Sequence, residues 1–192
     1  MVEIIVLLMS AILVENFVLM QFLGICPFLG VSNKLSTAIG MSGAVIFVMT
    51  IASFFTKLVY DLLLVRFGLE YLKTIAFILV IAALVQFVEI ILKRFIPPLY
   101  KALGIYLPII TTNCAVLGAA LINIQREYSL LNSVVYGFGA GVGFMVAMVL
   151  FAGVRERLEH CDIPESFKGL PITMIAAALV SIGFFGFKGL GG

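Results

Sequence analysis

Six apolar stretches separated by short polar breaks make up almost the whole chain. They cover residues 4–31, 39–60, 74–92, 105–124, 134–154 and 170–187. A helix that crosses a bilayer needs about 20 apolar residues, and each stretch is close to or above that length. The charged residues gather in the breaks, which are too short to fold into a soluble domain. The pattern predicts an all-α, polytopic membrane protein with six transmembrane helices.

Two of these stretches carry features that break helices. As one helix, residues 4–31 would be roughly 42 Å long, whereas the hydrocarbon core of a bilayer is about 30 Å thick. Gly24, Pro27 and Gly30 lie near the end of this stretch. The fourth stretch is interrupted near its middle by polar residues and a proline, namely Pro108, Thr111, Thr112 and Asn113. We therefore predict that the first and fourth helices are both broken, each beside a cysteine.

The motif Cys-x-x-Leu-Gly occurs twice, beginning at Cys26 and at Cys114. The second copy lies 88 residues after the first, which is close to half of the 192-residue chain. A repeat on this scale predicts two homologous halves, residues 1–95 and 96–192, within one membrane domain. Each half has three spans, and three is odd, so the second half must insert upside down relative to the first. This inverted repeat is the architecture of many transporters, whose sites lie on discontinuous helices.

The composition excludes a soluble protein. Hydrophobic residues make up 63% of the chain and charged residues only 11%, and the mean hydropathy is +1.24. The net charge of +2, with no long basic run, indicates no nucleic-acid partner, so the expected surroundings are membrane lipid and other subunits. Three cysteines provide no disulfide framework. Glu3, near the start, argues against a secretory signal peptide.

The distribution of Lys and Arg predicts the orientation in the membrane. With the N-terminus outside, the inner side carries seven basic residues and the outer side five. Basic residues concentrate on the cytoplasmic side of membrane proteins. Six spans then place the N-terminus and the C-terminus outside.

The two cysteines of the repeat are candidate metal ligands. Pro27 suits the first turn of a helix that begins beside Cys26, and Thr112 and Asn113 suit the cap of a helix that begins near Cys114. Free N–H groups at a helix start favour a thiolate, and two converging thiolates need a metal to neutralise them. An iron–sulfur cluster takes four ligands, so another subunit would supply two. The alternative is a pair of buried, inert cysteines.

Three other residues carry side chains that a functional site could use. Glu15 and Glu89 lie within spans, where an ionised group is costly and marks an ion path. Glu89 has Lys93 four residues on as a partner near the membrane edge. Glu15 has no such partner and is expected to be unpaired, which makes it the stronger candidate. Cys161, beside His160 in a polar loop, is expected to be a surface thiol.

The glycines at alternate positions from Gly137 to Gly143 do not have the spacing of a dinucleotide-binding loop. Two interleaved pairs four residues apart, Gly137 with Gly141 and Gly139 with Gly143, predict close contacts with neighbouring helices instead.

Several stretches resemble a known family of membrane proteins. They are residues 22–32 (FLGICPFLGVS), 86–89 (QFVE), 104–118 (GIYLPIITTNCAVLG), 136–139 (YGFG) and 155–157 (RER). The resemblance, which covers nearly the whole chain, is to the A subunit of the Rnf complex. The E subunit of the sodium-pumping NADH:quinone reductase is a related alternative, although the two cysteine stretches look more like Rnf.

The resemblance implies a prokaryotic cytoplasmic-membrane complex that passes electrons between reduced ferredoxin and NAD, coupled to translocation of Na⁺ or H⁺. The chain would be one of several subunits, without catalytic activity on its own. In that family, the cysteines matching Cys26 and Cys114 bind a 2Fe–2S cluster together with two from the E subunit, a homologue of opposite topology. Cys161 matches no such position. A stand-alone secondary transporter and a structural subunit with inert thiols remain as alternatives.

Overall fold

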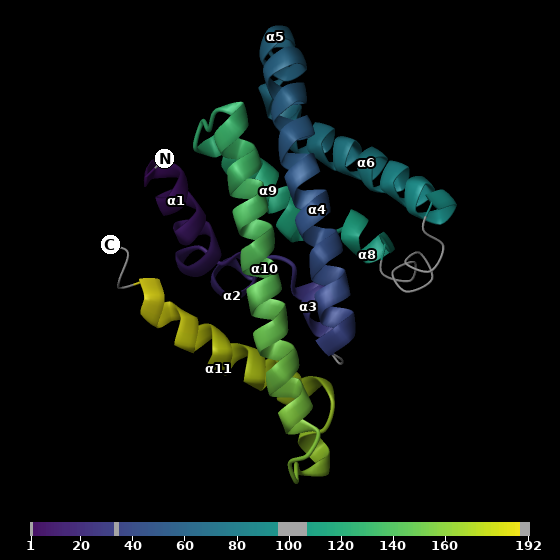
Figure 1. The fold of residues 1–192 in the computed structure, drawn as a ribbon, viewed down its shortest axis with the longest axis vertical. Coiled ribbons are helices and arrows are strands. Elements are labelled where there is room, and N and C mark those ends of the chain that lie inside the picture. The colour runs from purple at the N-terminus through teal and green to yellow at the C-terminus, as the bar shows by residue number, and fades with distance from the viewer. Residues whose placement is uncertain (1, 33–34, 96–106, 189–192) are drawn as a thin grey trace.

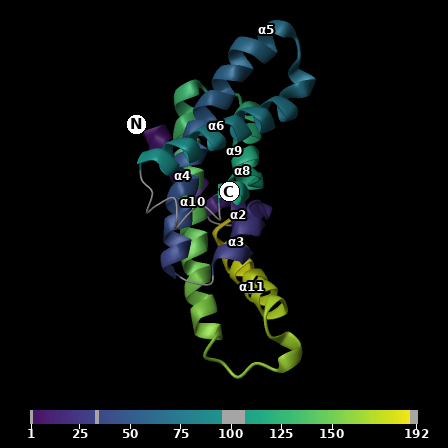
Figure 2. The same ribbon diagram turned by 90° about the vertical axis from the view of Figure 1, so that its right-hand side faces the viewer.

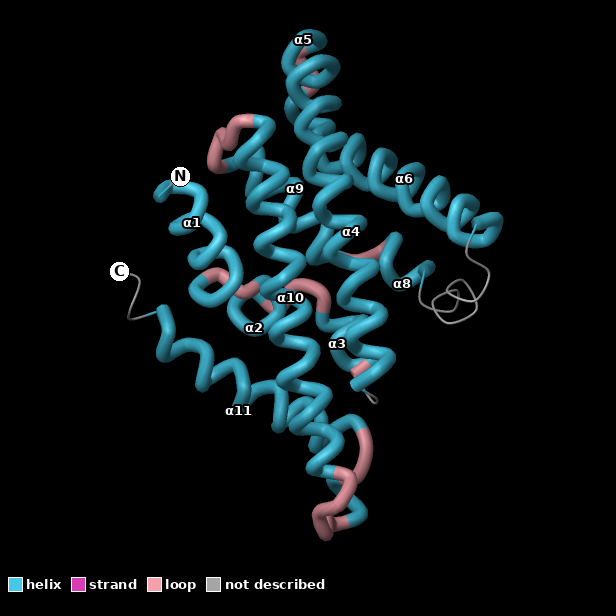
Figure 3. The backbone as a smooth tube through the Cα atoms, viewed as in Figure 1, coloured by secondary structure: helices cyan, strands magenta, loops and turns pink. Residues whose placement is uncertain are grey.

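Every regular element in the described part of the protein is a helix. The computed structural model describes residues 2–32, 35–95 and 107–188, and Figures 1 and 3 show these ranges as a set of long and short helices. The all-α expectation is therefore confirmed. The expected boundary between the halves, the prolines at 97 and 98 and the start of the fourth stretch at 105 lie outside the described residues.

Three helical stretches are long and apolar enough to cross a membrane, judged by length and composition: Leu35–Phe67, Glu70–Ile91 and Leu130–Leu158. The first comprises α4 (Leu35–Val59), the π-helical turn η2 (Tyr60–Leu64) and α5 (Val65–Phe67). The second begins with the 3₁₀ turn η3 (Glu70–Leu72) and continues in α6 (Lys73–Phe95). The third is α10 (Leu130–Leu158). The protein is therefore an integral membrane protein, as expected.

The expected end of the second span at residue 60 is wrong, because the helix continues to Phe67. Asp61 stays in the helix as the partner of Lys57, one turn earlier, with an N–O distance of 3.1 Å. An ion pair at this spacing offsets part of the cost of a charge at the end of a span. The chain then turns at Gly68, whose φ is +65°.

The first and fourth stretches are broken, as predicted. The first consists of α1 (Val2–Met9), the π-helical turn η1 (Ser10–Val14), α2 (Phe17–Gln21) and α3 (Ile25–Val31). The fourth consists of α8 (Leu107–Thr111) and α9 (Cys114–Gln125). The last helix, α11 (Leu170–Lys188), follows the short turn η4 (Glu165–Phe167). The breaks before α3 and before α9 both lie beside the cysteines.

The glycines of α10 bring other helices into close contact, as the sequence predicts. A Cβ atom added at Gly141 would lie 2.8 Å from Ile46 Cα of α4, and one at Gly137 would collide with Ser53 of the same helix. A Cβ at Gly143 would lie 3.1 Å from the Ala11 carbonyl oxygen in η1. One glycine pair therefore faces α4 and the other faces the first stretch, so α10 lies between them (Figure 1).

Asn16 secures the break in the first stretch against this glycine face. Its side-chain oxygen accepts from the N–H groups of Val18 and Leu19, and its amide donates to the Gly143 carbonyl at 2.7 Å. Asn16 is fully buried. A buried break needs such partners because no water satisfies the free backbone groups.

Candidate redox half-site

The two cysteine segments meet near the middle of the described helices. Cys26 is the second residue of α3, and Cys114 is the first residue of α9. The backbone N–H of Gly24 donates to Cys114 Sγ, with an N–S distance of 2.9 Å. The short helices α3 and α8 contact each other here, and Figure 2 shows α9, α8, α2 and α3 one below another on the same side of the molecule. Residues 90 positions apart in the sequence are therefore in direct contact.

Gly24 allows this close approach. It caps α3 with a φ of +83°, a left-handed conformation that favours glycine. A Cβ atom here would lie 3.1 Å from both Ala115 Cβ and Phe144 Cε2. The expected start of the helix at Pro27 is shifted, since the Gly24 carbonyl already accepts from Phe28 N–H at 3.3 Å. Cys26 therefore lies within the first turn.

Asn113 begins α9, as the sequence predicts. Its side-chain oxygen accepts from the Ala115 N–H at 3.0 Å, and the residue is 3% exposed. The Cys114 sulfur therefore lies at the start of a 12-residue helix, where the helix dipole favours negative charge. The Gly24 N–H adds a hydrogen-bond donor of the kind that accompanies metal-bound sulfur ligands.

The thiols are free and accessible. Cys26 is exposed, Cys114 is partly exposed, and neither is in a disulfide. Cys114 also lines a hollow of about 510 Å³ that runs along α9 to Arg126. Across the described ranges, no group of three or more Cys, His, Asp or Glu side chains is placed to hold a metal. Two free thiols beside helix starts are the kind and number of ligands that half of a four-cysteine iron–sulfur site requires.

Arg155 forms hydrogen bonds with the C-terminal end of α3, the helix that carries Cys26. The sequence alone does not reveal this role. The Arg155 guanidinium donates to the Leu29 carbonyl at 2.7 Å and to Ser32 Oγ at 2.9 Å. Both acceptors lie at the C-terminal end of α3, where carbonyl groups lack helical partners. The long-range contact positions the short helix that carries Cys26.

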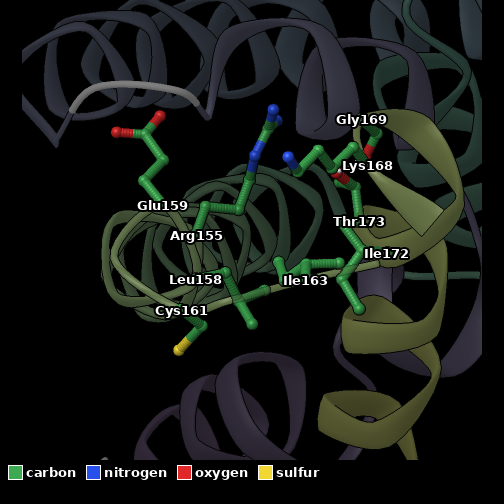
Figure 4. A pocket seen from close by; sticks show the side chains of 9 residues that line it. All are labelled: Arg155, Leu158, Glu159, Cys161, Ile163, Lys168, Gly169, Ile172 and Thr173. Carbon is green, nitrogen blue, oxygen red and sulfur yellow. Dashed lines mark hydrogen bonds between the residues drawn. The ribbon is translucent and has the colours of Figure 1, made fainter. Parts of the chain in front are cut away.

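Cys161 lies in a different environment. It follows α10 in an exposed turn and its Sγ contacts the Arg157 carbonyl at 3.5 Å. It lines a hollow of about 270 Å³ with Arg155 and Lys168. Figure 4 shows the Cys161 sulfur pointing away from these two cationic groups. Cys161 therefore contacts the end of α10 and has no part in the contact between Gly24 and Cys114.

The expectation that Glu15 lacks a partner is wrong. Its Oε1 accepts a hydrogen bond from the Arg126 guanidinium, although the residues are 111 positions apart. Arg126 also donates to the Tyr128 hydroxyl at 3.2 Å. These two hydrogen bonds raise the pKa of Arg126 above its ordinary value, and the bond to Glu15 has the larger effect. Glu89, the other carboxylate expected in a span, lies partly buried on α6.

Comparisons with known proteins show the family to which the chain belongs. The family described as "Rnf-Nqr subunit, membrane protein" matches residues 4–191. The A subunit of the ion-translocating oxidoreductase complex of Hahella chejuensis is 56% identical over 190 residues, covering 99% of this chain and 98% of the relative. The A subunit of the Na(+)-translocating ferredoxin:NAD(+) oxidoreductase complex of Acetobacterium woodii is 57% identical over 184 residues, covering 96% of each chain. The chain therefore belongs to the Rnf-Nqr family of membrane subunits.

Proposed function

We propose that this chain carries electrons across the membrane interior as the A subunit of an ion-translocating ferredoxin:NAD oxidoreductase complex. The similarity over nearly the full length to A subunits supports this assignment over the E subunit of the related quinone reductase. Within the complex, Cys26 and Cys114 hold half of a 2Fe–2S cluster, and the homologous E subunit supplies the other two thiolates. When bound, the cluster supplies one-electron transfer. The chain is a working part of the complex and does not catalyse alone.

One observation carries the proposal: the Gly24 N–H donates to Cys114 Sγ at the junction of the two cysteine helices. Hydrogen bonds to sulfur ligands stabilise negative charge and help to set the reduction potential of iron–sulfur sites. A pair of inert, apolar cysteines would be expected to pack in the core, whereas Cys26 is exposed and Cys114 partly so. The exposure of the two thiols favours a role as ligands that are completed by a partner subunit.

The chain alone should not retain a cluster, because two thiolates satisfy half of a four-ligand site. We expect little iron and acid-labile sulfide in the purified chain, and equimolar iron and sulfide once the E subunit is expressed with it. The amounts of iron and sulfide per protein are measured in both preparations. Stoichiometric iron and sulfide in the monomeric chain alone would contradict shared ligation.

We also propose the finer architecture as two inverted three-helix halves, residues 1–95 and 96–192. Each half has a broken first segment whose second part starts at or beside a cysteine, which supports the relation. The protein then lies in the prokaryotic cytoplasmic membrane with both termini outside.

Reporter fusions test this orientation. A reporter joined after Lys34 should be active on the cytoplasmic side, and one joined after Arg126 on the outer side. The opposite result at both positions would reverse the orientation and leave the inverted repeat intact. The same side at both positions would contradict the repeat itself.

Ion movement is proposed to involve Glu15 and Glu89, the carboxylates in the apolar segments. Glu15 lies at the break between η1 and α2. Breaks of this kind are where transporters bind their ions, because helix ends offer unpaired polar groups. The contacts of Glu15 indicate how its carboxylate could bind the transported ion.

A further inference from the structure

The Glu15 carboxylate uses only one of its oxygen atoms for the ion pair. Oε1 binds Arg126, whereas Oε2 is buried and has no hydrogen-bond partner among the described residues. The side chains are 26% exposed for Glu15 and 39% for Arg126. A buried carboxylate oxygen without a donor is costly, so this position favours a cation or a proton.

Tyr136 presents a second such oxygen to the same place. The residue is 1% exposed, and its hydroxyl is buried without a hydrogen-bond partner in the part of the chain that is described. Its ring centre lies 5.8 Å from the Arg126 guanidinium carbon and 5.5 Å from the Tyr128 ring centre. Arg126 is thus in contact with both the Glu15 carboxylate and the Tyr136 ring. The two unsatisfied oxygens therefore belong to one cluster around Arg126.

Two more buried oxygens continue this polar region between α9 and α10. Asn123 Oδ1 and Ser133 Oγ have no partner among the described residues, and both side chains are at most 1% exposed. The Asn123 amide donates to the Ser133 carbonyl at 3.4 Å, which joins the two helices here. Ser133 precedes Tyr136 by one helical turn. Hard cations prefer oxygen ligands, and these oxygen atoms have no competing hydrogen-bond partner among the described residues.

We propose that Glu15 and Tyr136 form a binding site for a monovalent cation, Na⁺ or H⁺, and that Arg126 occupies the carboxylate until that cation displaces it. The site rests on the proposed function in one respect, namely that the cation is the one the complex moves. Arg126 is a tethered competitor, because one carboxylate in apolar surroundings is neutralised by one positive charge at a time. Once displaced, its guanidinium enters the hollow along α9 that it already lines.

Chemical modification of the complete complex tests this competition. Phenylglyoxal modifies accessible guanidinium groups, and mass spectrometry locates each adduct. In the unmutated complex, replacing choline by Na⁺, or lowering the pH within the stable range, should raise modification of Arg126 several-fold as it leaves Glu15. Arg157, which is exposed at the end of α10, is the reference and should not respond. If neither Na⁺ nor acid changes the modification of Arg126 relative to Arg157, the competition does not exist.

Substitution of Arg126 gives the reciprocal test. A carbodiimide labels protonated carboxyl groups in apolar surroundings, and we expect Glu15 labelling to rise several-fold in Arg126→Gln and to stay near the original level in Arg126→Lys. Protection of Glu15 by Na⁺ over choline identifies a sodium site, and dependence on pH alone identifies a proton site. Labelling of Glu156, which is exposed near the end of α10, serves as the internal standard.

A third variant separates the two ligands. Tyr136→Phe in the Arg126→Gln background should weaken protection by Na⁺, or shift the pH dependence of labelling if the cation is H⁺. Unchanged Glu15 labelling in Arg126→Gln at every pH overturns the site, and an unchanged response in Tyr136→Phe removes the tyrosine from it. None of these readouts depends on an iron–sulfur cluster, so failure of the redox assignment would leave their outcome interpretable.

Discussion

Replacing Cys26 or Cys114 with serine should abolish the electron paramagnetic resonance signal of the reduced cluster and stop electron transfer from ferredoxin to NAD. Serine nearly matches cysteine in shape, but its hydroxyl is a poor ligand for iron centres that prefer soft thiolates. Because each chain supplies two of four ligands, the loss of either should be as damaging as the loss of both. The spectrum and the electron-transfer rate of each purified variant are measured.

Cys161→Ser provides the matched control. Cys161 is an exposed thiol in the turn after α10, and its substitution should leave the signal and the rate unchanged. All three variants must be compared as assembled complexes, because failed assembly also removes the signal. An assembled Cys26→Ser or Cys114→Ser complex with its original spectrum and full activity would show that the assigned site is wrong.

Gly24→Val should have the second largest effect, by separating the two cysteine helices. A valine at a φ of +83° is strained, which costs on the order of 1–3 kcal/mol. Its Cβ would also lie 3.1 Å from Ala115 Cβ and Phe144 Cε2, so the backbone must move. That movement withdraws the N–H group from Cys114 Sγ. We expect little cluster in the assembled complex and a shifted reduction potential for what remains.

Gly30→Val tests whether this effect is specific to Gly24. Gly30 lies in the same short helix, and a Cβ atom there would have no neighbour within 4 Å. Redox titration and iron content should therefore match the unmutated complex. Equal effects of the two substitutions would mean that valine damages α3 generally and that the Gly24 contact has no special role.

The local features of the site can be predicted from the sequence. Asn113 is a helix cap because its short side chain reaches the next free N–H group, and this requires only neighbours in the chain. The contacts of the glycine pairs of α10 can be predicted in the same way, because spacing along one helix determines which residues share a face. The breaks beside the cysteines follow from proline, glycine and polar residues in apolar stretches.

The long-range contacts cannot be predicted in this way. The ion pair of Glu15 and Arg126 joins residues 111 positions apart, and no pattern within either segment specifies the partner. Gly24 is one of 18 glycines, and its importance appears only when Cys114 lies against its N–H group. The continuation of the α4 helix through Asp61 depends on a local pair with Lys57, but the charge itself suggests a break.

Distance limits how strongly the redox site and the Glu15 site can influence each other directly. Cys114 and Arg126 lie at opposite ends of α9, which has 12 residues and a length of about 18 Å. One unit charge acts on another over that distance with about 1 kcal/mol at an effective dielectric constant near 20. A charge at the redox site would therefore change the equilibrium constant of the Glu15–Arg126 ion pair only several-fold by direct electrostatics. Tighter coupling requires movement of α9 or of a neighbouring protein in the complex.

The most direct test of the central claim is to locate iron in the assembled complex. A density map at a resolution that separates side chains should show a two-iron centre bonded to Cys26 Sγ and Cys114 Sγ of this chain and to two sulfur atoms of its homologous partner. A map of an intact, active complex in which these two thiols are joined to each other, or lie apart from all iron, would contradict the account.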